Sequence, residues 1–121
     1  MIPQPISLPD PATRLARAKR GYTTRRVPLA AMTRLLDCRS ATPRAGDLVL
    51  AQVVAIGKHA HLEQPGGRRA ALFVGDDILV SYAPRYAPDQ FEARLPRDCG
   101  ACHLVAGGGV AAEVMSRHGA I

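Results

Sequence analysis

Residues 98–110, DCGACHLVAGGGV, combine several side chains that could do chemistry within one short stretch. Cys99, Cys102 and His103 match the C-x-x-C-H string that attaches c-type haem, and the two cysteines alone have the spacing of a redox dithiol. The three glycines at 107–109 could turn free backbone N–H groups toward an anion. Haem attachment, thiol redox chemistry and anion binding are therefore the functions to weigh for this stretch.

The surrounding sequence favours a simpler interpretation of the same residues. Haem attachment requires export, and the N-terminus lacks the charged and apolar regions of a secretory signal. A redox dithiol needs its first cysteine at a helix N-terminus, and the glycines after His103 would not sustain a helix. A structural zinc site would need the distant Cys38 as its fourth ligand. We interpret Cys102 as a small buried apolar residue, Cys99 as incidental, and the glycines as positions of close backbone packing.

A second group, His59, His61 and Glu63, alternates along KHAHLEQ. In an extended strand all three lie on one face, with neighbouring positions about 6.6 Å apart, close enough to be ligands of one ion. A solvated polar face produces the same alternation. A metal-dependent small-molecule enzyme that uses these residues is therefore kept as an alternative, and no metal ligand is assigned.

The densest polar cluster lies in the proline-flanked stretch RYAPDQFEA, residues 85–93. An arginine can bind an anion through two parallel hydrogen bonds, and a carboxylate can hold an amine or act as a base. Equally, Tyr86 and Phe91 could anchor the loop while Glu92 caps a helical turn. We predict substrate or partner contacts for Arg85, Tyr86 and Gln90. Proton transfer or orientation is predicted for His59, His61, Asp89, Glu92 and His103.

The net charge of +6 is concentrated near the N-terminus, because nine of the sixteen Lys and Arg residues fall within residues 1–46. Such a segment favours an anionic partner, which could be nucleic acid, an acidic protein, or a phosphate or sulfate ligand. Tyr22 is the only aromatic residue near these arginines that could stack on a base. A stand-alone nucleic-acid-binding barrel is therefore kept only as an alternative. The arginines predicted to dock the anionic partner are Arg14, Arg17, Arg20, Arg25 and Arg26.

Short elements must position these groups. Asp10 and Pro11 begin a helix that ends before Gly21, residues 22–27 could be a strand, and Pro28 begins a second short helix. GDLVLAQVVAIG, RRAALFV and DILVSY are predicted strands between glycine-rich turns. DQFEAR is predicted as one helical turn, HLVA as a strand and VAAEVMSRH as a closing helix. The pattern predicts an α+β fold, a small SH3-like or OB-like β-barrel with short helices at the N- and C-terminal ends.

The length of 121 residues fits one compact domain. Within it we predict a basic helical segment over residues 1–45 and a small barrel with a C-terminal helix over residues 46–121. No apolar run approaches the about 20 residues that span a bilayer. Together with the lack of a secretory signal, this predicts a cytoplasmic protein that does not associate with a membrane.

The segment from Pro43 to Gly119 resembles the small N-terminal domain of a group of bacterial proteins in which a P-loop nucleotide-binding-type domain follows in the same chain. The resemblance lies in PRAGDLVLAQV, GKHAHLE, GRRAALFVGDDILVSYAPRYAPDQFEA and CHLVAGGGVA, and RYAPDQFEA and HLVAGGGVA are its most specific parts. It implies that Cys102 and His103 lie in an ordinary strand. Because the sequence stops at Ile121, we expect the P-loop domain to be a separate polypeptide that binds an exposed apolar patch.

Split pairs of this kind resemble the two-subunit enzyme of azinomycin-type biosynthesis. There a P-loop subunit similar to sulfotransferases acts with a small companion on a substrate tethered to an acidic amino-group carrier protein. The resemblance implies sulfonation of a hydroxyl from an adenylyl sulfonate donor (PAPS), followed by amine attack that closes an aziridine. It implies that this chain alone binds no cofactor, that PAPS binds the partner subunit, and that the basic segment suits the donor and the carrier.

Overall fold

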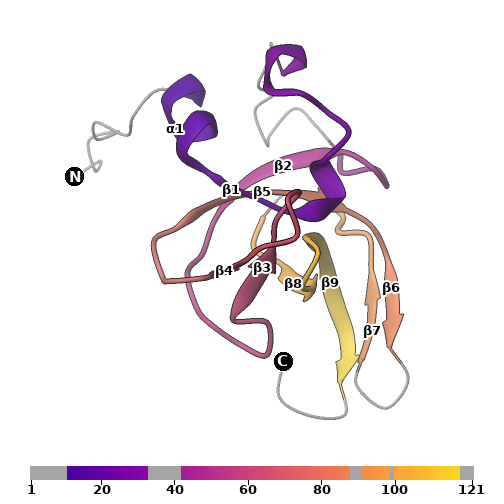
Figure 1. Ribbon diagram of the computed structural model, residues 1–121. Helices are drawn as coiled ribbons and strands as arrows, with labels where there is room; N and C mark the ends of the chain where they lie inside the picture. Colours follow the sequence, from indigo (N-terminus) through magenta and orange to yellow (C-terminus); the bar gives the residue numbers. More distant parts are fainter. Residues whose placement is uncertain (1–10, 33–41, 88–90, 99, 118–121) are drawn as a thin grey trace, which may run out of the picture.

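The computed structural model describes residues 11–32, 42–87, 91–98 and 100–117, and short strands dominate these ranges (Figure 1). The helical elements are α1 (Pro11–Arg17) and the 3-10 turns η1 (Tyr22–Thr24) and η2 (Leu29–Ala31). The strands are β1 (Lys19–Arg20), β2 (Leu48–Gln52), β3 (His61–Glu63), β4 (Arg69–Ala71), β5 (Asp77–Tyr82), β6 (Arg85–Ala87), β7 (Phe91–Arg94), β8 (His103–Ala106) and β9 (Val110–Arg117).

Strand β5 is the centre of the fold, and all six of its residues are buried. β2 pairs with it antiparallel along one edge, from Leu48 opposite Ser81 to Gln52 opposite Asp77. β1 and β9 both pair with it in parallel, β1 along its first half and β9 along its second. Because β2 occupies one edge over the full length, β1 and β9 share the other. This setting explains why DILVSY is almost uninterruptedly apolar, as expected of a strand covered on both faces.

Two glycines meet where β1 gives way to β9 along that edge. The Gly21 N–H donates to the Leu79 carbonyl at 2.9 Å, and the Ser81 N–H donates to the Gly109 carbonyl at 3.0 Å. A Cβ on Gly109 would lie 2.9 Å from the Cα of Gly21, and Gly109 has a φ of +102°. Only glycine combines this φ with so close an approach of two backbones. The packing interpretation of the glycine run is therefore confirmed at Gly109.

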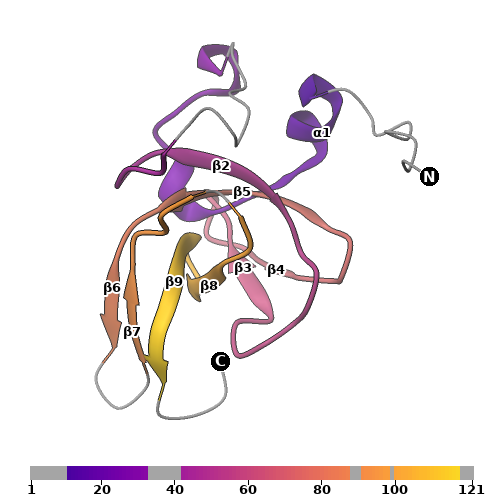
Figure 2. The ribbon, with the colours of Figure 1, turned by 180° about the vertical axis from the view of Figure 1, so that it is seen from behind.

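The predicted closing helix VAAEVMSRH is wrong, because its residues 110–117 form β9, the longest strand described, while residue 118 lies outside the described residues. β9 pairs with β8 through a tight hairpin and with β7 over its second half. The predicted helical turn DQFEAR is also wrong, since Phe91–Arg94 is the strand β7, which pairs with β6 and β9. Helix propensity is a weak preference that strand pairing overrides at both places. Figure 2 shows β6, β7 and β9 side by side, forming an arm that extends away from α1.

The sheet is open in the described part of the chain. Its order is β1-β5-β9-β7-β6, with β2 added on β5 and β8 on β9, while β3 and β4 form a separate two-stranded sheet. The predicted closed barrel and its C-terminal helix are therefore not found among the described residues. The coarser prediction holds: short strands in mixed sheets with a few short helices are consistent with an α+β fold. The SH3-like or OB-like type stays a prediction.

The N-terminal segment is joined to the sheet by α1, β1 and the turn η1. The helix predicted from Pro11 is confirmed over Pro11–Arg17, but it ends earlier than predicted because Lys19–Arg20 is the strand β1, and the strand predicted over residues 22–27 is wrong. Instead, the Arg20 guanidinium donates to the carbonyls of Thr24 and Val27, which draws this stretch into a compact turn. The helix predicted from Pro28 is a single 3-10 turn in the described part, and its remainder lies outside the described residues. No helix in the described ranges has the length and apolarity needed to cross a bilayer.

The apolar core lies between the central strands and the β3–β4 hairpin. Leu62 on β3 is fully buried and packs with Leu72, Ile78, Val80 and Tyr82. A smaller cluster around Val105 fills the space beneath β9. Because the β3–β4 hairpin is a separate sheet, its position depends on this core and on the chain segment that leads into it.

Candidate functional site

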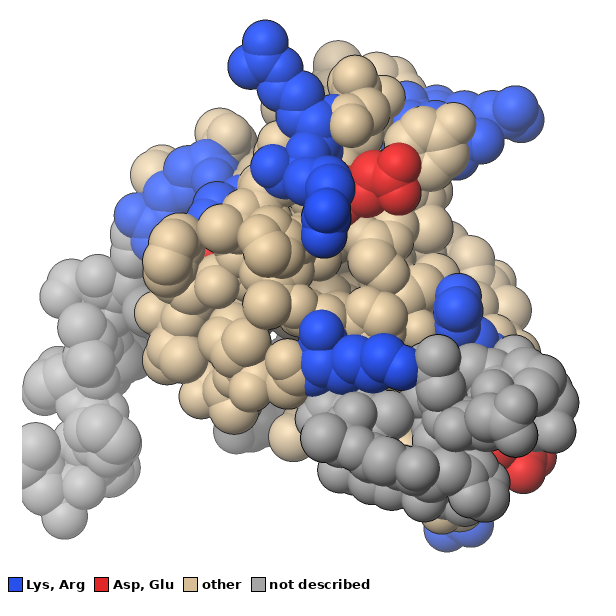
Figure 3. All heavy atoms as spheres, turned by 60° about the horizontal axis from the view of Figure 1, so that its bottom comes forward, with Lys and Arg blue, Asp and Glu red and all other residues tan. Residues whose placement is uncertain are grey.

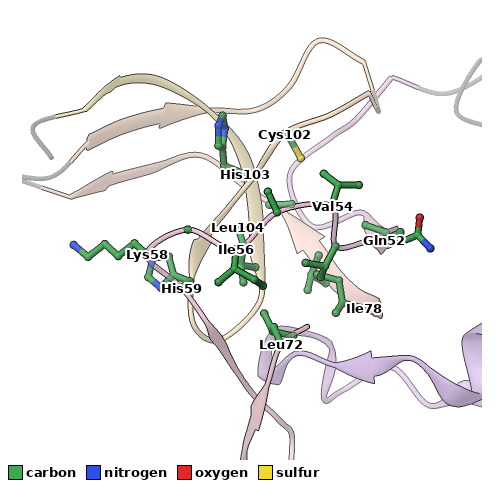
Figure 4. Close-up of a pocket in the computed structure, with 16 residues that line it drawn as sticks. Gln52, Val54, Ile56, Lys58, His59, Leu72, Ile78, Cys102, His103 and Leu104 are labelled. Atoms are coloured by element: carbon green, nitrogen blue, oxygen red, sulfur yellow. The ribbon is translucent and has the colours of Figure 1, made fainter. Parts of the chain in front are cut away.

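A pocket of about 420 Å³ opens between the core and the connection from β2 to β3. This volume lies within the range of about 300–1,000 Å³ that is usual for small-molecule pockets. Its wall is largely aliphatic, and none of the residues that line it is an aspartate or a glutamate. Figure 4 shows Ile56, Leu72 and Leu104 near its middle, with Lys58 directed away on one side and Gln52 on the other. We call this cavity the apolar pocket.

The outer wall of the apolar pocket is the connecting segment of residues 53–60. Its start is held because the Val53 N–H donates to the Asp76 carbonyl and the Gly75 N–H donates to the Val53 carbonyl. Its end is held because the Leu72 N–H donates to the Ala60 carbonyl at 2.9 Å. Between these ends the segment is not part of a strand. The segment is therefore fixed at both ends and passes over the core between them. The apolar pocket lies between this segment and the core.

His59 is the polar residue at this wall with the most unusual environment. Its Nε2 atom is buried and has no hydrogen-bond partner among the described residues. Burial lowers the pKa of His59, and the positive charges of Arg85 and Lys58 lower it further. The imidazole is therefore neutral at neutral pH and can donate or accept one hydrogen bond at Nε2, depending on its tautomer.

His103 at the start of β8, and Cys102 directly before it, supply further polar atoms to the wall of the apolar pocket. His103 accepts a hydrogen bond at Nδ1 from the Val114 N–H at 3.3 Å, which fixes its ring against β9. Burial is the main cause that raises the pKa of the Cys102 thiol, so the thiolate is disfavoured. Cys102 is a partly buried thiol that lies directly before β8, so only His103 begins the strand that the resemblance implied for both residues. Cys99 and Cys38 lie outside the described residues.

A second, more polar hollow of about 270 Å³ adjoins the first and shares Lys58 and His59 with it. We call it the polar hollow, and His61, Glu63 and Arg69 also line it. On β3, His61 and Glu63 are exposed and Leu62 is buried, which confirms the predicted alternation. However, among the described residues no three His, Cys, Asp or Glu side chains are grouped closely enough to hold a metal ion. The hollow thus offers no support for the metal-dependent alternative.

The predicted cluster in RYAPDQFEA is only partly assembled in the described chain. Arg85 and Tyr86 lie on β6, and Tyr86 pairs in register with Glu92 on β7. Arg85 is exposed, and its charge acts on His59 across the fold. Asp89 and Gln90 lie outside the described residues.

The basic N-terminal residues are bound within the fold rather than forming a free arm. The Asp77 carboxylate, whose side chain is 4 % exposed, accepts hydrogen bonds from Arg14 at 2.7 Å and from Arg17 at 3.3 Å. Arg20 binds carbonyls of its own turn, and the Arg25 guanidinium lies 4.0 Å from the centre of the Tyr22 ring. Fewer free guanidinium groups are thus left for phosphate contacts than the sequence suggested. Docking of an anionic partner by these arginines and Arg26 stays a prediction.

Sequence reasoning missed the apolar pocket itself. Its signal was the apolar run VVAI after β2, which continues beyond the residues that pair with β5. From the sequence alone, such an apolar run is interpreted as a continuation of the strand, because only the folded chain shows that it lies over the pocket.

Comparisons of this chain with protein-family models, with the curated proteins and with the solved structures gave no match.

We expect His59 to make the fold less stable in acid. A histidine whose pKa is lowered in the folded state must gain its charge at a free-energy cost, so stability is lost as the pH falls through the ordinary imidazole pKa of about 6.5. Above that pH the contribution is constant. Thermal unfolding at about pH 8 and pH 5.5 should show a smaller acid shift in His59→Gln than in the parent chain. His61→Gln, changed at an exposed site on β3, should keep the parent's shift. An unchanged shift in His59→Gln would contradict this assignment.

Proposed function

We propose that this chain is a companion subunit, without a P-loop of its own, of a two-component P-loop enzyme. The observation that carries the proposal is an exposed apolar patch formed by Val54, Phe73 and Val74, which are 75, 63 and 65 % exposed. The backbone bonds of Val53 to Gly75 and Asp76 bring the segment with Val54 beside the turn with Phe73 and Val74. Large apolar side chains so exposed at one place are typical of a surface that a partner protein covers. We call it the Val54 patch.

The charge around the apolar surface suits an anionic partner or substrate. The Lys19 ammonium lies 5.2 Å from the centre of the Phe73 ring and pairs with Asp76 at 2.6 Å. Figure 3 shows basic side chains at several places on one face of the molecule, with acidic side chains beside some of them. Basic groups at the rim of an apolar interface speed and orient the approach of an acidic partner more than they raise final affinity.

The reaction that we propose for the pair is sulfonate transfer to an amino-acid intermediate tethered to an acidic carrier protein. The hydroxyl oxygen of the intermediate attacks the sulfur of PAPS held on the P-loop subunit, and the hydroxyl proton and the adenosine bisphosphate leave. The amine nitrogen of the same intermediate then displaces the sulfate from carbon, which closes an aziridine. In this proposal the present chain acts in the cytoplasm, and it orients the acceptor because holding the amine in line supplies most of the advantage of an intramolecular step. Its support is the resemblance of RYAPDQFEA and HLVAGGGVA together with the Val54 patch.

Co-purification tests the proposal. We expect a P-loop protein to be encoded beside this chain. The tagged chain, expressed with that protein, should retain it, and the double variant Val54→Glu/Val74→Glu should lose it. Both positions are exposed, so the variant should keep the parent's melting temperature. Met115→Glu, a charge introduced at another exposed apolar position, is the matched control and should retain the partner. A parent chain that stays monomeric beside the P-loop protein, or an unaffected double variant, would overturn the proposal.

A further inference from the structure

We propose that the apolar pocket binds a small aliphatic monocarboxylate, with the chain among the core residues and the carboxylate at Lys58 and His59. This site goes beyond the companion role, because it is formed by the chain alone and needs no second subunit. The interior of the pocket selects the hydrocarbon chain of the ligand, and the end of the pocket at residues 58–59 selects the charge of its head group.

The interior of the apolar pocket favours a flexible hydrocarbon. Ile78 and Val80 from β5, Leu72 from the hairpin and Leu104 from β8 all contribute to its wall. No Phe, Tyr or Trp lines the apolar pocket, and the rings in its wall are the imidazoles of His59 and His103. Most of the wall is therefore aliphatic, and an alkyl chain gains about 0.8 kcal/mol for each CH₂ that it buries against it.

The end of the apolar pocket at residues 58–59 favours a negative charge. Lys58 and His59 line both the apolar pocket and the polar hollow, so they stand where the two cavities adjoin. The buried Nε2 atom of His59 has no partner among the described residues, so a turn of the imidazole ring that brings it to a ligand oxygen removes a cost. In the tautomer with its proton on Nε2, the turned ring can donate to a carboxylate oxygen. The exposed Lys58 side chain, which is directed away from the empty pocket, can swing back to neutralise the charge together with the more distant Arg85. The same cations disfavour an amine.

The polar hollow explains why a carboxylate is a better ligand than a larger anion. Glu63 lies in the hollow beyond His59, together with Arg69 and His61. A phosphate monoester would bring more negative charge toward Glu63, and a sulfate ester, although it carries a single charge, would bring more oxygen atoms. A carboxylate, with a single charge and two oxygens, can stay at Lys58 and His59.

Titration of the ¹⁵N-labelled chain with octanoate, octanol and octylamine tests the head group. We expect octanoate to shift the amide signals of residues 51–59 and 102–104, and octanol to bind about tenfold more weakly, because it lacks the charge-assisted hydrogen bonds. Octylamine should bind more weakly than octanol. Equal affinities for the three compounds, or no shifts of these amides at millimolar octanoate, would overturn the proposal.

Two further comparisons locate the site. Lys58→Gln and His59→Phe should each weaken octanoate by about tenfold and leave octanol unchanged, whereas Arg68→Gln, in the exposed turn between β3 and β4, should change neither. Affinity should rise by about fourfold per CH₂ from butanoate until the apolar pocket is filled. An affinity that does not change with chain length would contradict burial of the ligand's hydrocarbon chain in the apolar pocket. The titrations use the isolated chain, so their outcome is independent of co-purification with a P-loop protein. Either proposal can be overturned while the other stands.

Discussion

Gly109→Ala should lower the free energy of unfolding by about 4 kcal/mol, which is near the upper end of what single substitutions do. The new Cβ would lie 2.9 Å from the Cα of Gly21 and 3.2 Å from the Cγ1 of Val80, so backbone and core would both have to move. The φ of +102° adds backbone strain for any residue with a side chain. Since Gly109 lies at the point where β9 takes over from β1, the displacement would disturb both strand pairings on β5.

Gly107→Ala is the matched control, because it lies in the same turn but a Cβ there would meet nothing within 4 Å. We expect it to change stability by less than about 1 kcal/mol. Urea unfolding followed by circular dichroism measures both variants against the parent chain. Similar midpoints for the two variants would show that glycine at 109 is not needed for close packing.

Asp77→Asn should lower the free energy of unfolding by about 3 kcal/mol, since it breaks a largely buried ion pair and leaves the arginines uncompensated. The carboxylate side chain is 4 % exposed and is the common acceptor for Arg14 and Arg17. An asparagine keeps the volume but loses the charge. The helix α1 should detach from β5 as a result, and the loss should be smaller than for a fully buried pair because Arg17 is largely exposed.

The pH dependence gives an independent check on Asp77. The hydrogen bond from Arg14 is the largest cause that holds the pKa of Asp77 below its ordinary value of 3.8. The stability from this pair is therefore present above that value and is lost as the pH falls through the lower, folded-state pKa. Asp77→Asn should lack this acid-dependent loss. Arg44→Gln, which removes an exposed pair with Asp47, should leave both stability and its pH dependence almost unchanged. An equal effect of the two variants on stability would contradict a structural role for Asp77.

The elements predicted correctly are those in which local preference and long-range pairing agree. DILVSY is β5 because its apolar middle, with the β-branched Ile78 and Val80, favours a strand and β1, β2 and β9 all pair with it. PATRLAR is α1 because proline at the first turn and alanine and arginine after it all favour a helix. VAAEVMSR has a similar composition, yet it is β9, because a glycine with positive φ begins a hairpin there and two neighbouring strands pair with it.

The candidate site was predictable only in part for the same reason. The alternation of His61, Leu62 and Glu63 could be predicted because it is a local pattern. The apolar pocket could not, since its walls come from β5, β8, the hairpin and a connecting segment that meet only in the folded chain. Nor could the sequence show that Arg14 donates a hydrogen bond to Asp77, because the two residues are 63 positions apart. Charge counts alone therefore overstated how many arginines are available to a partner.

The sharing of one edge of β5 by β1 and β9 has a consequence for how the chain folds during synthesis. Thr23 bonds to Gly109, 86 positions later, and Arg14 bonds to Asp77, 63 positions later. At synthesis rates of about 5–20 residues per second, the first segment emerges seconds before the strand that receives it. Loops of this length close slowly, so refolding should be slower than for a helical domain of equal size. Residues 110–117 of β9 are synthesised after β1 and β5, so until β9 pairs, the second half of this edge of β5 stays open to other chains.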